Sequence, residues 1–166
     1  MIILGIDPGT AATGWGAIKN VKRRNSKKVF ELLQYGCIRT SPLLKMPNRL
    51  LLLRDELSEI IGKFKPDSIV VERLFFNTNT KTAISVGQAR GVIMLLAAEH
   101  KVEFFEYTAL QAKKVLSGYG RATKIEMQEV TAKYLGVEGK IRPDDAADAL
   151  AMAIFHGKFL DANNIK

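Results

Sequence analysis

The order of strand-like and helix-like segments is the feature of this sequence that most limits its fold. Short apolar runs predict strands, and apolar residues repeated every three or four positions predict helices. Strands are predicted at Ile2–Ile6, Thr13–Lys19, Val29–Thr40, Ser68–Val71 and Val102–Tyr107, and helices at Pro47–Phe64, Thr80–His100, Ala109–Leu116, Thr123–Leu135 and Pro143–His156. This order predicts an α/β fold, a five-stranded mixed sheet flanked by helices.

The chain length of 166 residues fits one domain, which we place at residues 1–158 with a short tail at 159–166. The apolar start Met1–Asp7 is too short for a signal peptide, and no apolar run approaches the ~20 residues of a membrane span. We therefore expect a soluble, cytoplasmic protein. Cys37, the single cysteine, can form no internal disulfide and is expected to be a small buried residue.

Excess positive charge indicates a polyanionic partner. The net charge is +8, and three long segments contain no acid: Pro8–Phe30, Arg73–Ala98 and Tyr107–Ile125. Neutralising phosphates gives the sequence-independent part of nucleic-acid affinity, so this charge favours a nucleic-acid partner over a merely solubilising surface. For the basic loop Lys19–Lys28, phosphate contact and a solvated loop tip both remain open, and we do not assign it as a site.

Four acids stand where an acid is unfavourable without a reason. Asp7 and Glu72 each follow an apolar strand, and Asp145 and Asp148 share one face of the last predicted helix. Carboxylates at two strand ends and on one helix face can converge on one spot. Their mutual repulsion calls for a cation, and ligands made only of oxygen favour Mg²⁺. Two such ions would support phosphodiester cleavage, with Mn²⁺ as a substitute.

Each acid also has a simpler explanation. Asp7 could cap the turn at Pro8-Gly9, and Glu72 could pair with Arg73. For Asp144, directly after Pro143, we prefer stabilisation of the helix N-terminus by its negative charge. Both histidines lie at predicted helix ends, in agreement with a site that needs no histidine ligand.

Four motifs in register, spanning Ile3 to about His156, resemble the RuvC family of Holliday-junction resolvases. They are Gly5–Gly9 (GIDPG) continued by Thr13–Gly16 (TGWG), Val71–Phe75 (VERLF), Gly87–Gly91 (GQARG) and Asp145–Ala151 (DAADALA). The resemblance implies a ribonuclease-H-like fold and a magnesium-dependent homodimer. Such an enzyme nicks symmetrically paired strands of four-way DNA junctions in recombination and repair, leaving 5′-phosphate and 3′-hydroxyl ends. It also implies partnership with a branch-migration motor.

The resemblance further implies roles for individual residues. The metal-site acids match Asp7, Glu72, Asp145 and Asp148, and the basic residues beside the scissile phosphate match Lys113 and Lys124. Without the resemblance, both lysines could equally be solvated helix residues.

Contacts with DNA bases and with a second subunit follow from the same resemblance. The aromatic residue that stacks on bases matches Phe75, and Phe76 is then expected to pack in the core. The sequence alone also allows the reverse assignment. Lys114 and Arg121 are weaker DNA-binding candidates, and we expect the Gly118–Arg121 turn to be a mobile basic loop. Gly87 and Gly91 would allow a second subunit to approach closely, or that helix face packs on its own sheet.

Other functions remain possible from the sequence. One is a related nuclease with another substrate, such as a ribosomal RNA processing factor or a transposase fragment. Another is an inactive junction-binding scaffold, which the intact acids argue against. A sugar-kinase-like phosphate binder would lack a second glycine-rich phosphate loop and would leave the charge unexplained.

Overall fold

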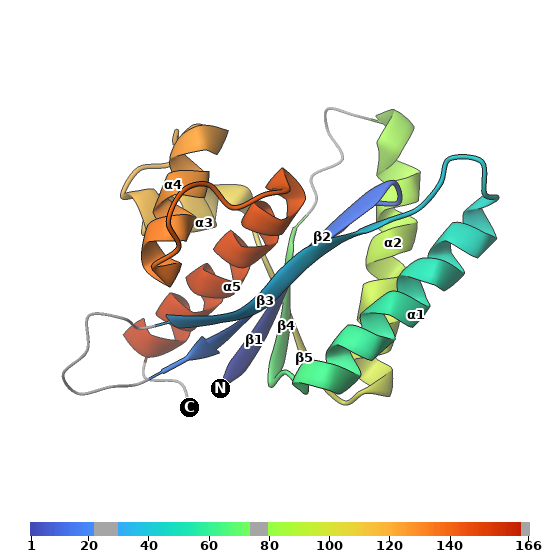
Figure 1. The fold of residues 1–166 in the computed structure, drawn as a ribbon, viewed down its shortest axis with the longest axis horizontal. Coiled ribbons are helices and arrows are strands. Elements are labelled where there is room, and N and C mark those ends of the chain that lie inside the picture. Colours follow the sequence, from blue (N-terminus) through green and yellow to red (C-terminus); the bar gives the residue numbers. More distant parts are fainter. Residues whose placement is uncertain (22–29, 74–79, 164–166) are drawn as a thin grey trace.

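A central sheet separates two helical layers (Figure 1). The computed structural model describes residues 1–21, 30–73 and 80–163. Its strands are β1 (Ile2–Asp7), β2 (Ala12–Asn20), β3 (Phe30–Arg39), β4 (Ser68–Glu72) and β5 (Glu103–Tyr107). They lie in the order β3-β2-β1-β4-β5, with β1–β2 and β2–β3 antiparallel and β1–β4 and β4–β5 parallel. The predicted five-stranded mixed sheet is confirmed.

The helices divide between the two faces of the sheet. Their bounds are α1 (Met46–Phe64), α2 (Thr80–Glu99), α3 (Ala109–Ser117), α4 (Lys124–Leu135) and α5 (Asp144–Ala162). Figure 1 shows α1 and α2 on one side, and α5 with α3 and α4 on the other. The last helix continues past its predicted end, so His156 is a buried residue inside α5 and residues 159–162 of the predicted tail are helical. The division into residues 1–158 and a tail otherwise remains a prediction.

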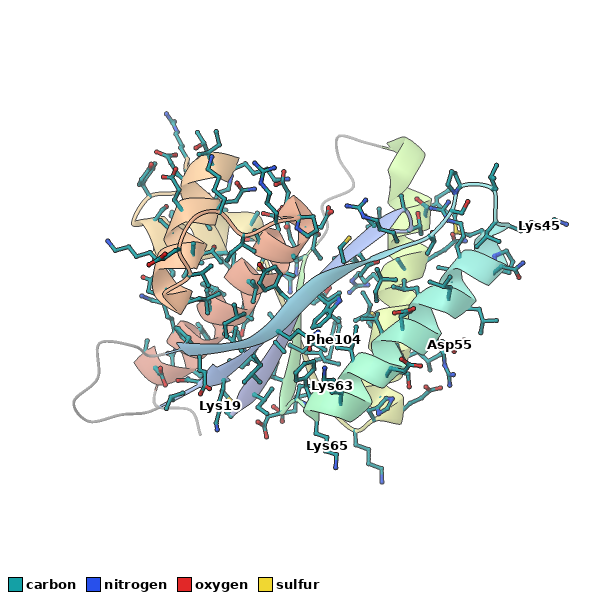
Figure 2. The ribbon with its side chains drawn as sticks, viewed as in Figure 1. Lys19, Lys45, Asp55, Lys63, Lys65 and Phe104 are labelled. Atoms are coloured by element: carbon teal, nitrogen blue, oxygen red, sulfur yellow. The ribbon has the colours of Figure 1, made fainter. Side chains whose placement is uncertain are left out.

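Alternation along the strands fills two separate cores. In β1, Ile3 packs with Leu150 and Ile154 of α5, whereas Leu4 packs with the core under α1 and α2. Phe104 of β5 adds to the α1–α2 side (Figure 2). Among the helices of the described residues, none is both long and apolar enough to cross a membrane.

Glycines on β1 and β2 allow α5 to lie directly on the sheet. A Cβ at Gly5 would collide with the carbonyl oxygen of Ala149, and a Cβ at Gly14 with that of Asp145. The facing helix is rich in alanine, which also keeps the layers close. This close approach fixes the first turns of α5 against the ends of β1 and β2.

Candidate functional site

Parallel pairing brings Asp7 and Glu72 to the same end of the sheet. The register pairs Ile6 of β1 with Val71 of β4, so the next residue of each strand is its terminal acid. Both acids are half-buried. Two carboxylates on adjacent strands at one edge form one half of a candidate site.

The first turns of α5 supply the other half. Asp145 and Asp148 are half-buried, while the neighbouring Ala146 and Ala147 are buried. Because Gly14 lies under the carbonyl of Asp145 and pairs with Asp7 across the sheet, the helix start is held beside the end of β1. The helix therefore adds its acids to the acids of the strands.

Burial and mutual repulsion disfavour ionisation of three of these acids. The pKa of Asp7 is raised to about 7, first by burial and then by the charges of Asp148, Glu72 and Asp145. Burial also raises the pKa of Glu72, with a further contribution from Asp148, and burial raises the pKa of Asp148 itself. Since the pKa of Asp7 responds to all three other acids, the four carboxylates lie within one region.

Two lysines flank these carboxylates. The Lys124 Nζ lies 3.4 Å from an Asp144 carboxylate oxygen and 3.5 Å from an Asp148 carboxylate oxygen. The positive charge of Lys113 lowers the pKa of Glu72, against the larger effect of burial. Lys124 is the first residue of α4, and a capping box between Thr123 and Glu126 stabilises that helix start.

The chemistry of this site fits a hard divalent cation. Across the described ranges, no three His, Cys, Asp or Glu side chains stand close enough to enclose a metal ion in this arrangement. The four acids nevertheless offer only carboxylate oxygens, which suit Mg²⁺. The raised pKa values of Asp7, Glu72 and Asp148 show that additional positive charge would be favourable there.

Cys37 belongs to this site and is not the buried apolar residue that we expected. It is half-exposed, and its thiol lies 3.8 Å from a carboxylate oxygen of Asp145, to which it can donate a weak hydrogen bond. The sheet register explains its position, because Asp7 pairs with Gly14 and Gly14 pairs with Cys37. Nothing in the sequence around Cys37 indicates this contact, since it depends on the pairing of three strands.

The remaining candidate residues lie apart from the acids or outside the described residues. Lys114 lines an apolar hollow with Phe155 and Phe159, on another side of α3 from Lys113. Arg121 is exposed in the α3–α4 connection. Phe75, Phe76 and most of the Lys19–Lys28 loop lie outside the described residues.

The turn that contains Arg121 makes hydrogen bonds with both neighbouring helices, and its mobility stays a prediction. The Tyr119 hydroxyl donates to Glu126 at 2.5 Å, and the Ser117 hydroxyl donates to the Tyr119 carbonyl at 2.9 Å. Both hydrogen bonds involve Tyr119, which thereby contacts the end of α3 and the first turn of α4.

The sheet order, its mixed pairing and the acids at the ends of β1 and β4 define a protein of the ribonuclease-H-like class. The sequence model of the family described as "Crossover junction endodeoxyribonuclease RuvC" matches residues 3–156. The chain belongs to this RuvC family, whose members are endonucleases. The ribosomal RNA processing factor, the transposase fragment and the sugar-kinase-like protein considered from the sequence are therefore wrong.

Individual relatives agree with this assignment over nearly the whole chain. A crossover junction endodeoxyribonuclease RuvC of Ruminiclostridium cellulolyticum is 48% identical over 157 residues, which cover 95% of this chain and 92% of that protein. The solved structure of Thermus thermophilus RuvC has 32% identity and a TM-score of 0.89, covering 99% of this chain and 98% of that one. A second T. thermophilus RuvC structure, in complex with a Holliday junction substrate, has 31% identity and a TM-score of 0.89, covering 98% and 96%.

Proposed function

We propose that this protein resolves Holliday junctions by symmetric, metal-dependent nicking of two strands, leaving 5′-phosphate and 3′-hydroxyl ends. The observation that carries the proposal is a group of four acids at the C-terminal ends of β1 and β4 and in the first turns of α5: Asp7, Glu72, Asp145 and Asp148. The charges of the other three raise the pKa of Asp7, so the four act on one another. Similarity to a RuvC solved with a Holliday junction supports this substrate. The cellular role would be DNA recombination and repair in the cytoplasm of a bacterium.

The proposed cofactor is Mg²⁺, with two ions per site and Mn²⁺ as a substitute, held by the same four carboxylates. When bound, these ions would supply a reactive water and stabilise the leaving oxygen. The protein's part is to bring the acids together and orient them, and the positive charge of bound ions would favour their ionised forms. Asp7, whose pKa of about 7 leaves it only partly ionised at neutral pH without a cation, would be the acid most changed by metal binding.

Lys113 and Lys124 are the proposed cationic groups beside the scissile phosphate. Each lies near a different acid, Lys113 by Glu72 and Lys124 by Asp148, so the two would approach the phosphate from two sides. Positive charges placed before the reaction can stabilise negative charge that develops in the transition state. Phe75, Lys114 and Arg121 are proposed as further DNA contacts, with Phe75 stacking on bases near the crossover.

A homodimer is proposed to place one site on each of two strands. On α2, Ile84 and Leu95 are 75% and 57% exposed. Between them, no residue of the described part of the chain lies within 4 Å of a Cβ built at Gly87 or Gly91. The alternative that this small-residue face packs on its own sheet is therefore wrong. An open apolar stripe on a helix suits an isologous contact between two copies. Association with a branch-migration motor complex is proposed from the family alone.

The decisive test is cleavage of a mobile synthetic four-way junction with Mg²⁺ or with EDTA. We expect wild type to make paired nicks only with Mg²⁺ and to leave duplex DNA and RNA–DNA hybrid intact. Asp148→Asn should bind the junction but cut at least ~100-fold more slowly. Asp55→Asn, which changes an exposed acid of α1 paired with Arg54, is the matched control and should cut normally.

Two other outcomes would replace the proposal. Junction binding by wild type without any cleavage would favour an inactive scaffold. Preference for an RNA-containing substrate would keep the nuclease and change its substrate.

A further inference from the structure

Asp144 lies beside the four acids but makes different contacts from theirs. The Gln128 Nε2 donates to one of its carboxylate oxygens at 2.8 Å, and the Lys124 Nζ lies 3.4 Å from the other. Lys124 and Gln128 are four residues apart on α4, so they are neighbours on one helix face. The Asp144 carboxylate thus connects the start of α5 to two successive turns of α4.

Lys124 is held between two carboxylates with different expected tasks. Its Nζ lies 3.5 Å from Asp148, which the proposed function assigns to the metal, and 3.4 Å from Asp144, which it does not. A cation bound at Asp148 would compete with the lysine for that carboxylate. Asp144 would remain as the anionic partner that keeps the ammonium group nearby.

The backbone of Lys124 is also fixed. The Thr123 hydroxyl caps α4 by accepting from the Glu126 backbone amide, and the Glu126 carboxylate accepts from the Thr123 amide in return. The same carboxylate accepts from the Tyr119 hydroxyl. A lysine side chain has many rotamers, so holding both its backbone and its ammonium group reduces the entropic cost of reaching one position.

Two observations distinguish Asp144 from the four acids. Its side chain is 57% exposed, against 37% for Asp148. One of its two oxygens accepts from the buried Gln128, so that oxygen is already engaged by a donor from another helix. These contacts suit a residue that orients a neighbour.

We propose that Asp144 is a positioning residue that holds the Lys124 ammonium group at the edge of the active site and acts on cleavage only through it. The inference rests on the proposed function of Lys124 in cleavage. It adds to our interpretation from the sequence that Asp144 stabilises the N-terminus of α5, where the structure places it in the first turn.

The test is a double-mutant cycle on single-turnover junction cleavage with saturating enzyme. We expect Asp144→Asn to slow cleavage about tenfold and Lys124→Met about 100-fold. The double variant should be no slower than Lys124→Met, because Asp144 has nothing left to position. Asp161→Asn is the matched control and should cut normally. Asp161 also lies on α5, and its carboxylate accepts a hydrogen bond from the side chain of Asn20 on β2.

A second measurement does not depend on activity. In the metal-free protein, the ¹³Cε–¹Hε NMR signal of Lys124, assigned by its absence in Lys124→Met, should move toward that of a free lysine in Asp144→Asn and stay in place in Asp161→Asn. Calcium titration by calorimetry should show a much smaller loss of affinity for Asp144→Asn than for Asp148→Asn, because only Asp148 is expected to touch the ion. Gln128→Met removes the hydrogen-bond donor to Asp144 and leaves the charge of Asp144 in place. It should slow cleavage by a factor of about three.

Several results would overturn the proposal. Additive effects in the cycle would show that Asp144 acts independently of Lys124. A loss of calcium affinity in Asp144→Asn as large as that in Asp148→Asn would make Asp144 a metal ligand. An unmoved Lys124 signal would show that Asp144 does not hold the lysine. If wild type cut no junction, the proposed function would fail, while the NMR comparison would still decide whether Asp144 positions Lys124.

Discussion

At the scale of single residues, the folded environment of Asp7 changes how readily its carboxyl group ionises. Its pKa is raised from 3.8 to about 7 by burial and by three neighbouring acids. The folded protein therefore binds this proton more tightly than the unfolded chain does. Stability contributed by the protonated form is present below about pH 4 and is lost as the pH rises to about 7.

We accordingly expect the free energy of unfolding of wild type, taken relative to that of Asp7→Asn in EDTA, to fall between about pH 4 and about pH 7 and then to level off. The difference isolates Asp7 from the buried His156, whose pKa is lowered to about 4 and whose contribution to stability therefore rises with pH. Near pH 8, Asp7→Asn should be more stable than wild type by roughly 2 kcal/mol after allowance for partial exposure. Urea denaturation across this pH range measures both. Mg²⁺ should stabilise wild type more than the variant; equal stabilisation would contradict a metal held by Asp7.

Cys37 gives a second measurement at this scale. Burial raises the pKa of its thiol, with a further contribution from the adjacent Asp145. Since the thiolate is the reactive form, we expect slow alkylation by iodoacetamide near pH 8 in the native protein. Asp145→Asn should speed the reaction, and mass spectrometry follows it cleanly because the chain has one cysteine. An equal rate in urea-unfolded protein would contradict this environment.

At the scale of elements, the contact of α5 with β1 and β2 decides where half of the acids lie. Gly5 and Gly14 leave no space for a Cβ under the helix backbone. Since backbone carbonyls cannot move aside as flexible side chains do, any larger residue must displace the helix. Stability and site geometry are therefore coupled through these two positions.

Gly14→Ala should lower the free energy of unfolding by about 1–3 kcal/mol, because the added methyl overpacks this interface. It should also reduce junction cleavage more than junction binding, as Asp145 and Asp148 move relative to Asp7. Gly62→Ala is the control: Gly62 lies in α1 with open space around it, and alanine should leave stability unchanged or raise it by up to ~1 kcal/mol. Normal cleavage by Gly14→Ala would show that the helix position tolerates more than the structure implies.

At the scale of the whole molecule, the two helical layers have different surroundings. The α5 side carries the acids and lysines, and the α1–α2 side presents the apolar stripe on α2 that we propose as the contact between subunits. The site and the proposed subunit contact thus lie on different elements. A change at one should leave the fold of the other intact.

Gly91→Leu should dissociate the dimer, since no described residue of its own chain lies within 4 Å of a Cβ at this position and the new side chain would enter the partner's space. Sedimentation should show a folded monomer with an unchanged circular dichroism spectrum. Gly62→Leu, at an equally open position on α1, should remain dimeric. A monomeric wild type, or a dimeric Gly91→Leu, would exclude this face as the interface.

The sequence by itself determined the sheet, the helices and the identity of the four candidate acids. The pattern of apolar residues identified the strands, because the side chains of a strand that face a core must be apolar. Asp7 and Glu72 stood out because each ends an apolar strand, and Asp148 because it interrupts an alanine-rich helix. Such signals are local, and they survive in a one-dimensional pattern.

Only the tertiary structure decided the contacts of Cys37 and Asp144 and the open face of Gly91. Cys37 reaches Asp145 through the register of three strands, and Asp144 meets Lys124 and Gln128 only when α4 packs beside α5. These contacts join residues far apart in the chain. Their existence depends on distances of a few ångströms, which follow from packing between elements and leave no mark in the spacing of the sequence.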